Sequence, residues 1–434
     1  RHMHSAGHRD LIVYLCVFGK ETSALFKAQL HRAQLHGIKI VDLQNEENKW
    51  DKILSSTLVV DAIFGIGLSK AVSADFLKAI DKINSVKVPV VSLDCPSGLN
   101  VDTGMVQGAS VTATTTLSFG LAKPGFFVSQ GPHHVGNLRV LPIGFPFETL
   151  RGVATTHFVF NERLARRYLP QRRDTSNKSD FGHACLFAGS ELYWGAGVLA
   201  SSSAYRMGCG YVTWASFVKP LEHAGQIPEV LFSEVEDDKI WDESKVTAYA
   251  IGPGLGVNEK TAHLIERLKK QSRPVVVDAD AITTCVQYDL FPLPPLWIIT
   301  PHSGELSRIL KRDAREIESD RYQAALEASR KVGCHVLLKG YHSVIAFEER
   351  TMVINAGNSS LAKAGTGDVL TGMIVGLLAQ GLETLQASAT ACYIHGRIAD
   401  EWVRVGNNAR SLLASDLKDH LPNLMTRLES GAIF

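Results

Sequence analysis

Short apolar runs of strand length alternate with helical stretches along most of this chain, and no other feature restricts its fold so strongly. In the first part these runs are Leu11–Val17, Lys39–Leu43, Leu58–Phe64 and Val88–Leu93. Residues with helical spacing fill the stretches between them, as at Ala74–Ile83. Strands that are apolar throughout belong to sheets with both faces covered, and helical connections make such strands parallel. The sequence therefore predicts an α/β fold built on parallel sheet.

The same alternation returns on a larger scale after a break near the middle of the chain. Prolines and glycines cluster at Pro142–Phe147, and Arg163–Lys178 is rich in Arg, Pro, Asp and Ser. We expect a first domain over residues 1–147, a linker over 148–178 and a second domain over 179–434. Within the second domain we expect one helix over Ala314–Val332 and an apolar helix that begins near Val369.

Composition narrows the expected partners. The 45 Lys and Arg residues balance 44 Asp and Glu residues, so the charge gives no reason to expect nucleic acid or an anionic membrane. No stretch holds 18 or more uncharged apolar residues, which argues against a membrane span. Seven scattered cysteines without a Cys-x-x-Cys pair favour a reducing compartment. We expect a cytoplasmic homo-oligomer, or a mitochondrial one if a presequence precedes Arg1.

The strongest candidate for chemistry is Gly365-Thr366-Gly367-Asp368, which stands directly before the apolar helix. Glycines at a helix start let backbone N–H groups converge on one point, where the helix dipole favours an anion. Thr366 adds a hydroxyl, and a carboxylate at Asp368 can accept a proton from an attacking hydroxyl. A plain helix cap explains the same four residues, so the motif alone leaves both interpretations open.

Four further motifs follow predicted parallel strands of the second domain. They are Gly252-Pro-Gly-Leu-Gly256, Asp278-Ala-Asp280, Thr300-Pro-His-Ser-Gly-Glu305 and Lys339-Gly340. Ligands of open α/β sheets bind at the carboxyl ends of the strands. Four polar or glycine-rich segments at four such ends predict a ligand site at that edge.

Together these residues resemble the ADP-dependent NAD(P)H-hydrate dehydratases of the ribokinase superfamily. The resemblance covers about Asn177 to Ser415, and ordinary sugar kinases lack its Gly-Pro-Gly-Leu-Gly and Pro-His-x-Gly-Glu pieces in this combination. It also includes Lys178–His183, Phe187–Ser190, Gly195–Gly197 and Ile227–Glu229. The resemblance implies a ribokinase-like α/β/α domain.

The resemblance also implies the reaction. The substrate is the S form of hydrated NADH or NADPH (NADHX or NADPHX), in which water has added at C6 of the nicotinamide ring. ADP, or ATP in some members, phosphorylates the new hydroxyl with Mg²⁺ present. Phosphate then leaves and the dihydropyridine is restored. Phosphate is a good leaving group where hydroxide is a poor one, so the main task is to position and stabilise the transferring phosphoryl group.

Roles for individual residues follow from the same resemblance. Asp368 is the base on the substrate hydroxyl and contacts the hydrate. The other residues expected to line the hydrate site are Ala196, Gly254 and His302. The residues expected to contact the nucleotide are Leu338, Lys339, Gly340, Tyr341, His342, Gly365, Thr366 and Gly367. Simpler interpretations stay open: His302 as a buried structural histidine, Lys339 as a solvated charge, and Asp278 and Asp280 as turn residues.

The first domain carries two comparable motifs, Asp61–Ser69 and Asp94–Asn100, each at the end of a predicted strand. With Ala113–Phe119 and Lys123-Pro-Gly125 they resemble the NAD(P)H-hydrate epimerase domain, which interconverts the R and S hydrates. The resemblance implies a Rossmann-like three-layer domain and a K⁺ ion held by Asp61 and Ser97. It implies substrate contacts from Gly65, Ile66, Gly67, Leu68, Ser69, Lys70, Ala71 and Asp94.

One departure from the epimerase pattern affects this domain. The family has a Gly-Asn-Asn-Gly-Gly-Asp-Gly loop after its first strand, and nothing like it precedes His8. That loop supplies an Asn ligand to the ion and part of the dinucleotide site. We therefore expect that the N-terminal segment of the domain is missing here, which puts its epimerase activity in doubt.

Two other functions remain open at this point. A ribokinase-like vitamin or sugar kinase with a non-catalytic N-terminal binding domain would release a stable phosphorylated product. A binding or scaffold protein would use the first domain for contact with partners rather than for catalysis.

Overall fold

The computed structural model describes residues 1–434 except 1, 19–20, 45–50, 69, 219–226 and 432–434. The chain forms two compact units, Arg1–Val153 and Ala154–Phe434. Each is α/β with parallel strands, which confirms the fold class expected from the sequence. None of the described helices is long and apolar enough to cross a membrane.

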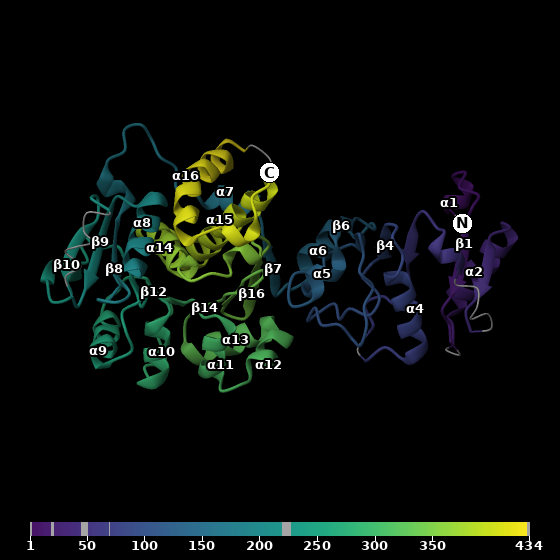
Figure 1. Ribbon diagram of the computed structural model, residues 1–434, viewed down its shortest axis with the longest axis horizontal. Coiled ribbons are helices and arrows are strands. Elements are labelled where there is room, and N and C mark those ends of the chain that lie inside the picture. The colour runs from purple at the N-terminus through teal and green to yellow at the C-terminus, as the bar shows by residue number, and fades with distance from the viewer. Residues whose placement is uncertain (1, 19–20, 45–50, 69, 219–226, 432–434) are drawn as a thin grey trace. The chain divides into compact units, whose positions relative to one another are not determined.

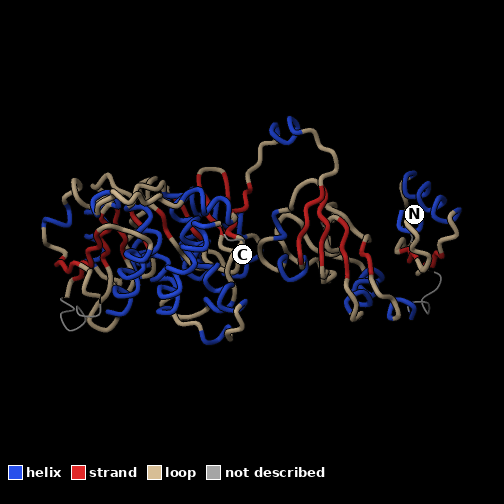
Figure 2. Tube along the Cα trace, turned by 90° about the horizontal axis from the view of Figure 1, so that it is seen from above, coloured by secondary structure: helices blue, strands red, loops and turns tan. Residues whose placement is uncertain are grey.

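The first unit contains two parallel sheets. Its strands are β1 (Ile12–Leu15), β2 (Lys39–Asp42), β3 (Val59–Asp61), β4 (Val90–Leu93), β5 (Thr115–Phe119) and β6 (Asn137–Leu141). Its helices are α1 (His2–Ser5), α2 (Ala24–Leu35), α3 (Asp51–Leu54), α4 (Ala74–Asn84), α5 (Gly131–Val135) and α6 (Phe147–Gly152). β1 and β2 form one pair, and β3–β6 lie in chain order in a sheet of four, side by side in Figure 2.

The four-stranded sheet brings the two expected motifs to one edge. Asp61 is the last residue of β3 and Asp94 follows β4, its direct neighbour. Behind them α4 presents an apolar face, with Phe76 and Ile80 buried against Val59 and Val90. This packing fixes the strand ends from which the polar side chains project.

The second unit is built on a sheet of ten strands. They are β7 (His157–Phe160), β8 (His183–Phe187), β9 (Tyr211–Ser216), β10 (Leu231–Glu234), β11 (Ala248–Ile251), β12 (Val275–Val277), β13 (Ile298–Ile299), β14 (His335–Leu338), β15 (Val344–Phe347) and β16 (Arg350–Ile354). Their order is β10-β9-β8-β11-β12-β13-β14-β15-β16-β7. Among these ten described strands, β15 alone runs antiparallel to both of its neighbours, β14 and β16.

Helices cover both faces of this sheet (Figure 1). The described ones are α7 (Glu162–Tyr168), α8 (Trp194–Arg206), α9 (Glu259–Leu268), α10 (Asp280–Gln287), α11 (Ser303–Leu310), α12 (Ala314–Ser319), α13 (Arg321–Val332), α14 (Thr366–Ala379), α15 (Thr384–Arg404) and α16 (Ala414–Ser430). Figure 1 shows α8, α14, α15 and α16 on one face and α9, α10, α11 and α13 on the other. Both faces of the strands are therefore buried, as their continuous apolar sequences require.

Helix α14 is the centre of the core. From Val369 to Ala379 every residue is buried. Its glycines let it approach α8 closely: a Cβ at Gly372 would lie 2.0 Å from the Ala200 carbonyl oxygen, and one at Gly376 would lie 2.7 Å from that of Ala204. This contact fixes α14, and with it the position of Asp368 in its first turn.

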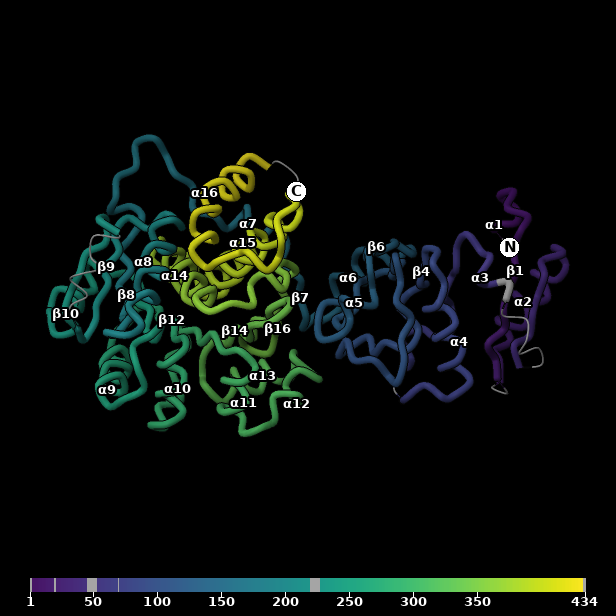
Figure 3. Tube along the Cα trace, in the orientation of Figure 1, coloured from purple at the N-terminus to yellow at the C-terminus, as the bar shows by residue number. Residues whose placement is uncertain are grey.

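The structure differs from the sequence expectations in two places. Residues 148–178, expected as a linker, hold α6, β7 and α7, and β7 pairs with β16 at the edge of the large sheet (Figure 3). The helix expected over Ala314–Val332 is two helices, because Asp320 leaves the helical conformation and caps α13 through the Gln323 amide. Local composition revealed neither the pairing of β7 with β16 nor the break at Asp320.

Candidate active site

The motifs expected at strand ends come together in the second unit. Strands β11, β12, β13 and β14 are consecutive neighbours in the sheet, and one motif follows each of them. Lys339 is tied to the next strand end, since its N–H donates to the Pro301 carbonyl at 2.8 Å. The sheet thus gathers Gly252–Gly256, Asp278, Thr300–Glu305 and Lys339 at one edge, as ligand binding in this fold class requires.

The glycine-rich turn before α14 has a fixed shape. Gly365 is the N-cap with φ +88°, a conformation that favours glycine. The Thr366 hydroxyl lies 2.9 Å from both the Leu361 and the Lys363 carbonyl oxygens, so it ties the incoming loop to the helix start. Thr366 is buried, while Gly367 and Asp368 are partly exposed. Asp368 therefore sits in the first helical turn and reaches solvent.

Its surroundings make Asp368 an unusually good base for a carboxylate. Burial is the largest cause that raises its pKa, the charge of Asp278 is the next, and together they bring it to about 7. Asp280 acts in the same direction, and Lys339 opposes it. A base with a pKa near the working pH is well matched to general base catalysis.

Asp278 and Lys339 form a buried ion pair beside this turn. The Lys339 Nζ lies 2.8 Å from Asp278 Oδ1, and the Asp278 side chain is only 2% exposed. Burial alone would raise the pKa of Asp278, but the Lys339 ammonium and hydrogen bonds lower it below its usual range. For Lys339, burial works against the Asp278 charge, and its pKa is raised overall. Both groups are therefore charged, so the interpretation of Lys339 as a solvated strand-end charge is wrong.

Gly367 leaves this ion pair open toward the helix start. A Cβ built on Gly367 would lie 3.6 Å from Lys339 Nζ and 3.7 Å from Asp278 Oδ2. The ammonium is thus next to the first-turn amides of α14. A cation and a helix N-terminus at one point make a site suited to phosphate.

The expected nucleotide segment Leu338–His342 is shaped by a buried arginine. The Arg321 guanidinium donates to the Leu338 carbonyl at 3.1 Å and to the Lys339 carbonyl at 3.2 Å. Gly340 has φ +157°, and a Cβ there would lie 2.6 Å from Arg321 Nη2. Tyr341 is 47% exposed and stacks on His342 with ring centroids 4.3 Å apart. The segment therefore offers an exposed aromatic face at the end of β14.

The residues expected to line the hydrate site divide into two groups. Gly254 packs beside Ala196, since a Cβ on Gly254 would lie 3.2 Å from the Ala196 Cβ. His302 is the N-cap of α11, and its Nδ1 accepts from the Gly304 amide at 3.0 Å. Its side chain is 58% exposed, so the interpretation of His302 as a buried structural histidine is wrong. With Nδ1 engaged as an acceptor, Nε2 is left to carry the ring proton.

Asp280 also has a specific partner at this edge. Its Oδ2 accepts the Gly256 amide at 2.9 Å, which ties the glycine-rich loop after β11 to the start of α10. Asp280 is in this sense a turn-stabilising residue, whereas Asp278 is a partner of Lys339.

Sequence reasoning missed His395, which lies on α15 far along the chain. Its Nε2–H donates to the Thr366 carbonyl at 3.0 Å, and burial lowers its pKa to about 4. No local pattern marks it, because a buried histidine in an apolar helix has no sequence signature. This hydrogen bond helps to hold the helix start that carries Gly367 and Asp368.

In the first unit, Asp61 and Ser97 do come together. Asp61 is 1% exposed, and its carboxylate accepts from the Ser97 hydroxyl at 2.6 Å, the Ser97 amide at 2.9 Å, the Ser92 hydroxyl at 2.8 Å and the Ile63 amide at 3.2 Å. A carboxylate has about four acceptor positions. The oxygen-rich set suits a hard cation, but an ion at Asp61 must displace one of these donors.

Asp94 is paired with Lys123, for which the sequence predicted no role. The Lys123 Nζ lies 2.5 Å from Asp94 Oδ1 and donates to Ser118 Oγ at 2.8 Å. Asp94 has φ +68°, an uncommon conformation for a residue with a side chain. The neighbouring loop is exposed at Gly65, Ile66, Gly67, Lys70 and Ala71 and partly buried at Leu68, while Ser69 lies outside the described residues.

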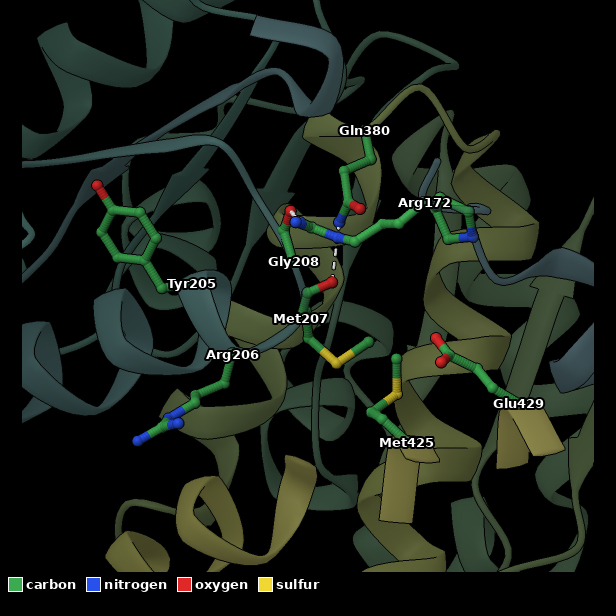
Figure 4. Close-up of a pocket in the computed structure, with 9 residues that line it drawn as sticks. Arg172, Tyr205, Arg206, Met207, Gly208, Gln380, Met425 and Glu429 are labelled. Carbon is green, nitrogen blue, oxygen red and sulfur yellow. Dashed lines mark hydrogen bonds between the residues drawn. The ribbon is translucent and has the colours of Figure 1, made fainter. Parts of the chain in front are cut away.

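A cavity of about 280 Å³ lies elsewhere in the second unit (Figure 4). It lies at the C-terminal ends of α8 and α14 and is lined by Arg172, Tyr205, Met207, Gln380 and Glu429, among others. Gln380 donates to the Met207 carbonyl at 2.9 Å, and Arg172 donates to that of Gly208, so the helix-end carbonyls have partners. None of the expected site residues lines this cavity, which is at the end of α14 opposite Asp368.

Among the described residues, no group of three or more His, Cys, Asp or Glu side chains is arranged to hold a metal ion. All seven cysteines are free, and all but Cys16 are buried.

Comparison with known proteins gives consistent matches for both units. A family model described as NAD(P)H-hydrate dehydratase matches residues 184–423, and one described as YjeF-related protein N-terminus matches residues 1–125. A bifunctional NAD(P)H-hydrate repair enzyme of Thermofilum pendens is 33% identical, over 99% of this chain and 84% of the relative. That of Moorella thermoacetica is 37% identical, over 87% of this chain and 74% of the relative.

A solved structure matches the second unit. The ADP/ATP-dependent NAD(P)H-hydrate dehydratase of Bacillus subtilis, co-crystallised with ATP and Mg²⁺, has a TM-score of 0.57 and 33% identity. The match covers 64% of this chain and all of that one.

Proposed function

The chain belongs to the family of bifunctional NAD(P)H-hydrate repair enzymes, and on that premise we propose how its residues divide the work. The second unit dehydrates the S form of hydrated NADH or NADPH in a nucleotide-dependent reaction. The first unit is the epimerase unit, which interconverts the R and S hydrates. The alternative of a vitamin or sugar kinase is not favoured, because the family model and the relatives agree on hydrate repair.

One observation carries the dehydratase assignment. Asp368, with a pKa raised to about 7, stands in the first turn of α14 next to the Lys339 ammonium and the glycine-rich turn. In the proposed mechanism Asp368 accepts the proton of the hydrate hydroxyl as that oxygen attacks the terminal phosphorus of the nucleotide. Lys339 and the first-turn amides stabilise the charge on the moving phosphoryl group. The nucleotide departs one phosphate shorter, as AMP from ADP or as ADP from ATP. Phosphate then leaves C6 while a proton leaves C5, and the new C5=C6 double bond restores the dihydropyridine.

We place the nucleotide against Leu338–His342 and the phosphates against Gly365–Gly367. The exposed face of Tyr341 and the fixed backbone around Gly340 support the first placement. The Lys339 ammonium beside Gly367 supports the second. Mg²⁺ would enter with the phosphates, since such ions are commonly held by substrate phosphates and water rather than by a protein cage. It would neutralise phosphate charge there.

The hydrate would lie between the Ala196–Gly254 contact and His302. A Cβ on Gly254 would lie 3.2 Å from the Ala196 Cβ. The His302 side chain is 58% exposed, and its Nε2, which lies 3.6 Å from Glu305 Oε2, can donate to the substrate. Gly254 follows β11 and His302 follows β13, and these strands lie on either side of β12, which precedes Asp278.

For the first unit we propose that Asp94 and the Gly65–Ala71 loop bind the hydrate and that K⁺ binds at Asp61 and Ser97. Substitution of K⁺ for one donor at Asp61, such as the Ile63 amide at 3.2 Å, would keep the carboxylate satisfied. We further propose a homo-oligomer in the cytoplasm, in keeping with seven free cysteines.

The direct test is optical. S-form hydrate is incubated with ADP or ATP and Mg²⁺, and recovery of the reduced-nicotinamide absorbance is followed for the wild type, Asp368→Asn and the control Asp237→Asn. We expect Asp368→Asn to lose about 10²–10⁴-fold in rate while the control keeps the wild-type rate. Asp237 is an exposed cap residue in the same unit, so it reports any general effect of removing a carboxylate. An active Asp368→Asn enzyme would remove Asp368 from its assigned role.

A further inference from the structure

A buried carboxylate with two well-formed contacts lies next to the proposed base, and no step assigned above uses it. Asp278 Oδ1 accepts from Lys339 Nζ at 2.8 Å, and Oδ2 accepts from the Thr371 hydroxyl at 2.8 Å. Asp278 follows β12, Lys339 follows β14, and Thr371 lies on α14. Three elements of the fold therefore meet in one hydrogen-bonded group.

The placement of Thr371 connects this group to the base. Thr371 is three residues after Asp368, so the two side chains share one face of α14. Thr371 is 1% exposed, and its hydroxyl is directed at Asp278. The face of the helix that carries the proposed base therefore also holds the carboxylate that binds Lys339.

A buried ion pair is weak evidence for stability, because removing charges from water costs about as much as their attraction returns. A lysine ammonium on its flexible four-carbon stem has no fixed position unless something holds it. Gly367 places no side chain between the pair and the helix start, since even a Cβ would lie within 3.7 Å of both groups. The Lys339 ammonium is therefore held by Asp278 at the start of α14, close to Asp368.

We propose that Asp278, fixed by Thr371, is a positioning residue of the dehydratase that holds the Lys339 ammonium beside Gly367 to face the phosphoryl group in transfer. The proposal rests on the function proposed above and deepens it. Asp278 does not touch the reacting atoms; it acts through Lys339. Its negative charge also faces Asp368 and favours the protonated form of that side chain, as Asp280 does, while Lys339 favours the ionised form. Glu305 is a further carboxylate that acts on Lys339.

Two readouts distinguish this role from a structural one. For Asp278→Asn we expect kcat to fall by about 10–100-fold, as for other residues that orient a catalytic group. We also expect the midpoint of the pH–rate profile to move to lower pH, because one negative charge near Asp368 is gone. A residue that only stabilised the fold would lower the melting temperature and leave that midpoint in place.

A double-mutant cycle tests whether Asp278 acts through Lys339. If it does, Asp278→Asn added to Lys339→Met costs little beyond Lys339→Met alone, whereas independent effects multiply. Thr371→Val, which removes one hydrogen bond and keeps the shape, should show a smaller loss of kcat, and Thr371→Ser should restore the rate. Asp237→Asn serves again as the control. If Asp278→Asn does not fold, the Thr371 pair decides the question.

The outcomes separate this inference from the proposed function. An inactive wild type with the S hydrate and either nucleotide overturns the function, whatever Asp278 does. An active wild type with an inactive Asp368→Asn, together with an Asp278→Asn enzyme of unchanged kcat and pH midpoint, overturns this inference alone. Fully multiplicative effects in the Lys339 cycle also overturn it.

Discussion

The dehydratase rate should rise with pH through a midpoint near 7, because Asp368 must be ionised to accept a proton. The side chain has its pKa raised from 3.8 to about 7, mainly by burial and then by Asp278. At pH 6 about one-eleventh of it is ionised, and at pH 8 about ten-elevenths, so kcat/KM for the hydrate should increase about tenfold over this interval. An aspartate of ordinary pKa would be fully ionised at both values and would give no change.

The assay is the optical dehydration measured at low concentrations of both ADP and hydrate, where the rate reports the enzyme with neither substrate bound. Tryptophan fluorescence at each pH shows whether the protein stays folded across the range. The control Asp237→Asn should give the same midpoint as the wild type. A flat profile between pH 6 and 8, or a rate that increases toward acid, would refute the assignment of Asp368 as a base with a raised pKa.

Three further predictions concern stability and the first unit. Folding lowers the pKa of His395 from 6.5 to about 4, so the stability that the neutral ring contributes is present above pH 6.5 and is lost as the pH falls toward 4. The loss in the free energy of unfolding should total about 3 kcal/mol. Urea unfolding should show this loss in the wild type and not in His395→Gln. Gly98→Ala should destabilise the first unit by about 2–4 kcal/mol, because φ is +98° and the new Cβ would lie 1.9 Å from the Ala109 carbonyl oxygen. In the control Gly65→Ala the new Cβ meets nothing within 4 Å, so thermal unfolding should show a change of less than about 0.5 kcal/mol. Lys123→Met should weaken the binding of hydrate to the first unit because it removes the partner of Asp94, whereas Lys123→Arg should keep part of that binding. Calorimetry with the purified R hydrate measures both affinities. If both variants bind this hydrate as the wild type does, the role of the pair in binding is contradicted.

The order of strands and helices was readable from the sequence for a local reason. Hydrophobic periodicity is set by neighbouring residues, and it marked β1, β2, β3 and β4 within a few residues of their observed bounds. The same reasoning found the Asp368 motif, since glycines before an apolar helix are a local signal. It failed at β7 and at the Asp320 break, where pairing with β16 and a capping hydrogen bond decide the outcome.

The sequence by itself determined which residue types stand at the strand ends and therefore which chemistry was available. Only the tertiary structure decided which of them touch. Lys339, Asp278 and Thr371 are far apart in the chain and meet because β12 and β14 lie either side of β13 and α14 packs over them. His395 reaches Thr366 for the same reason. Charge and burial act through space, so the raised pKa of Asp368 became visible only when the fold had placed these groups around it.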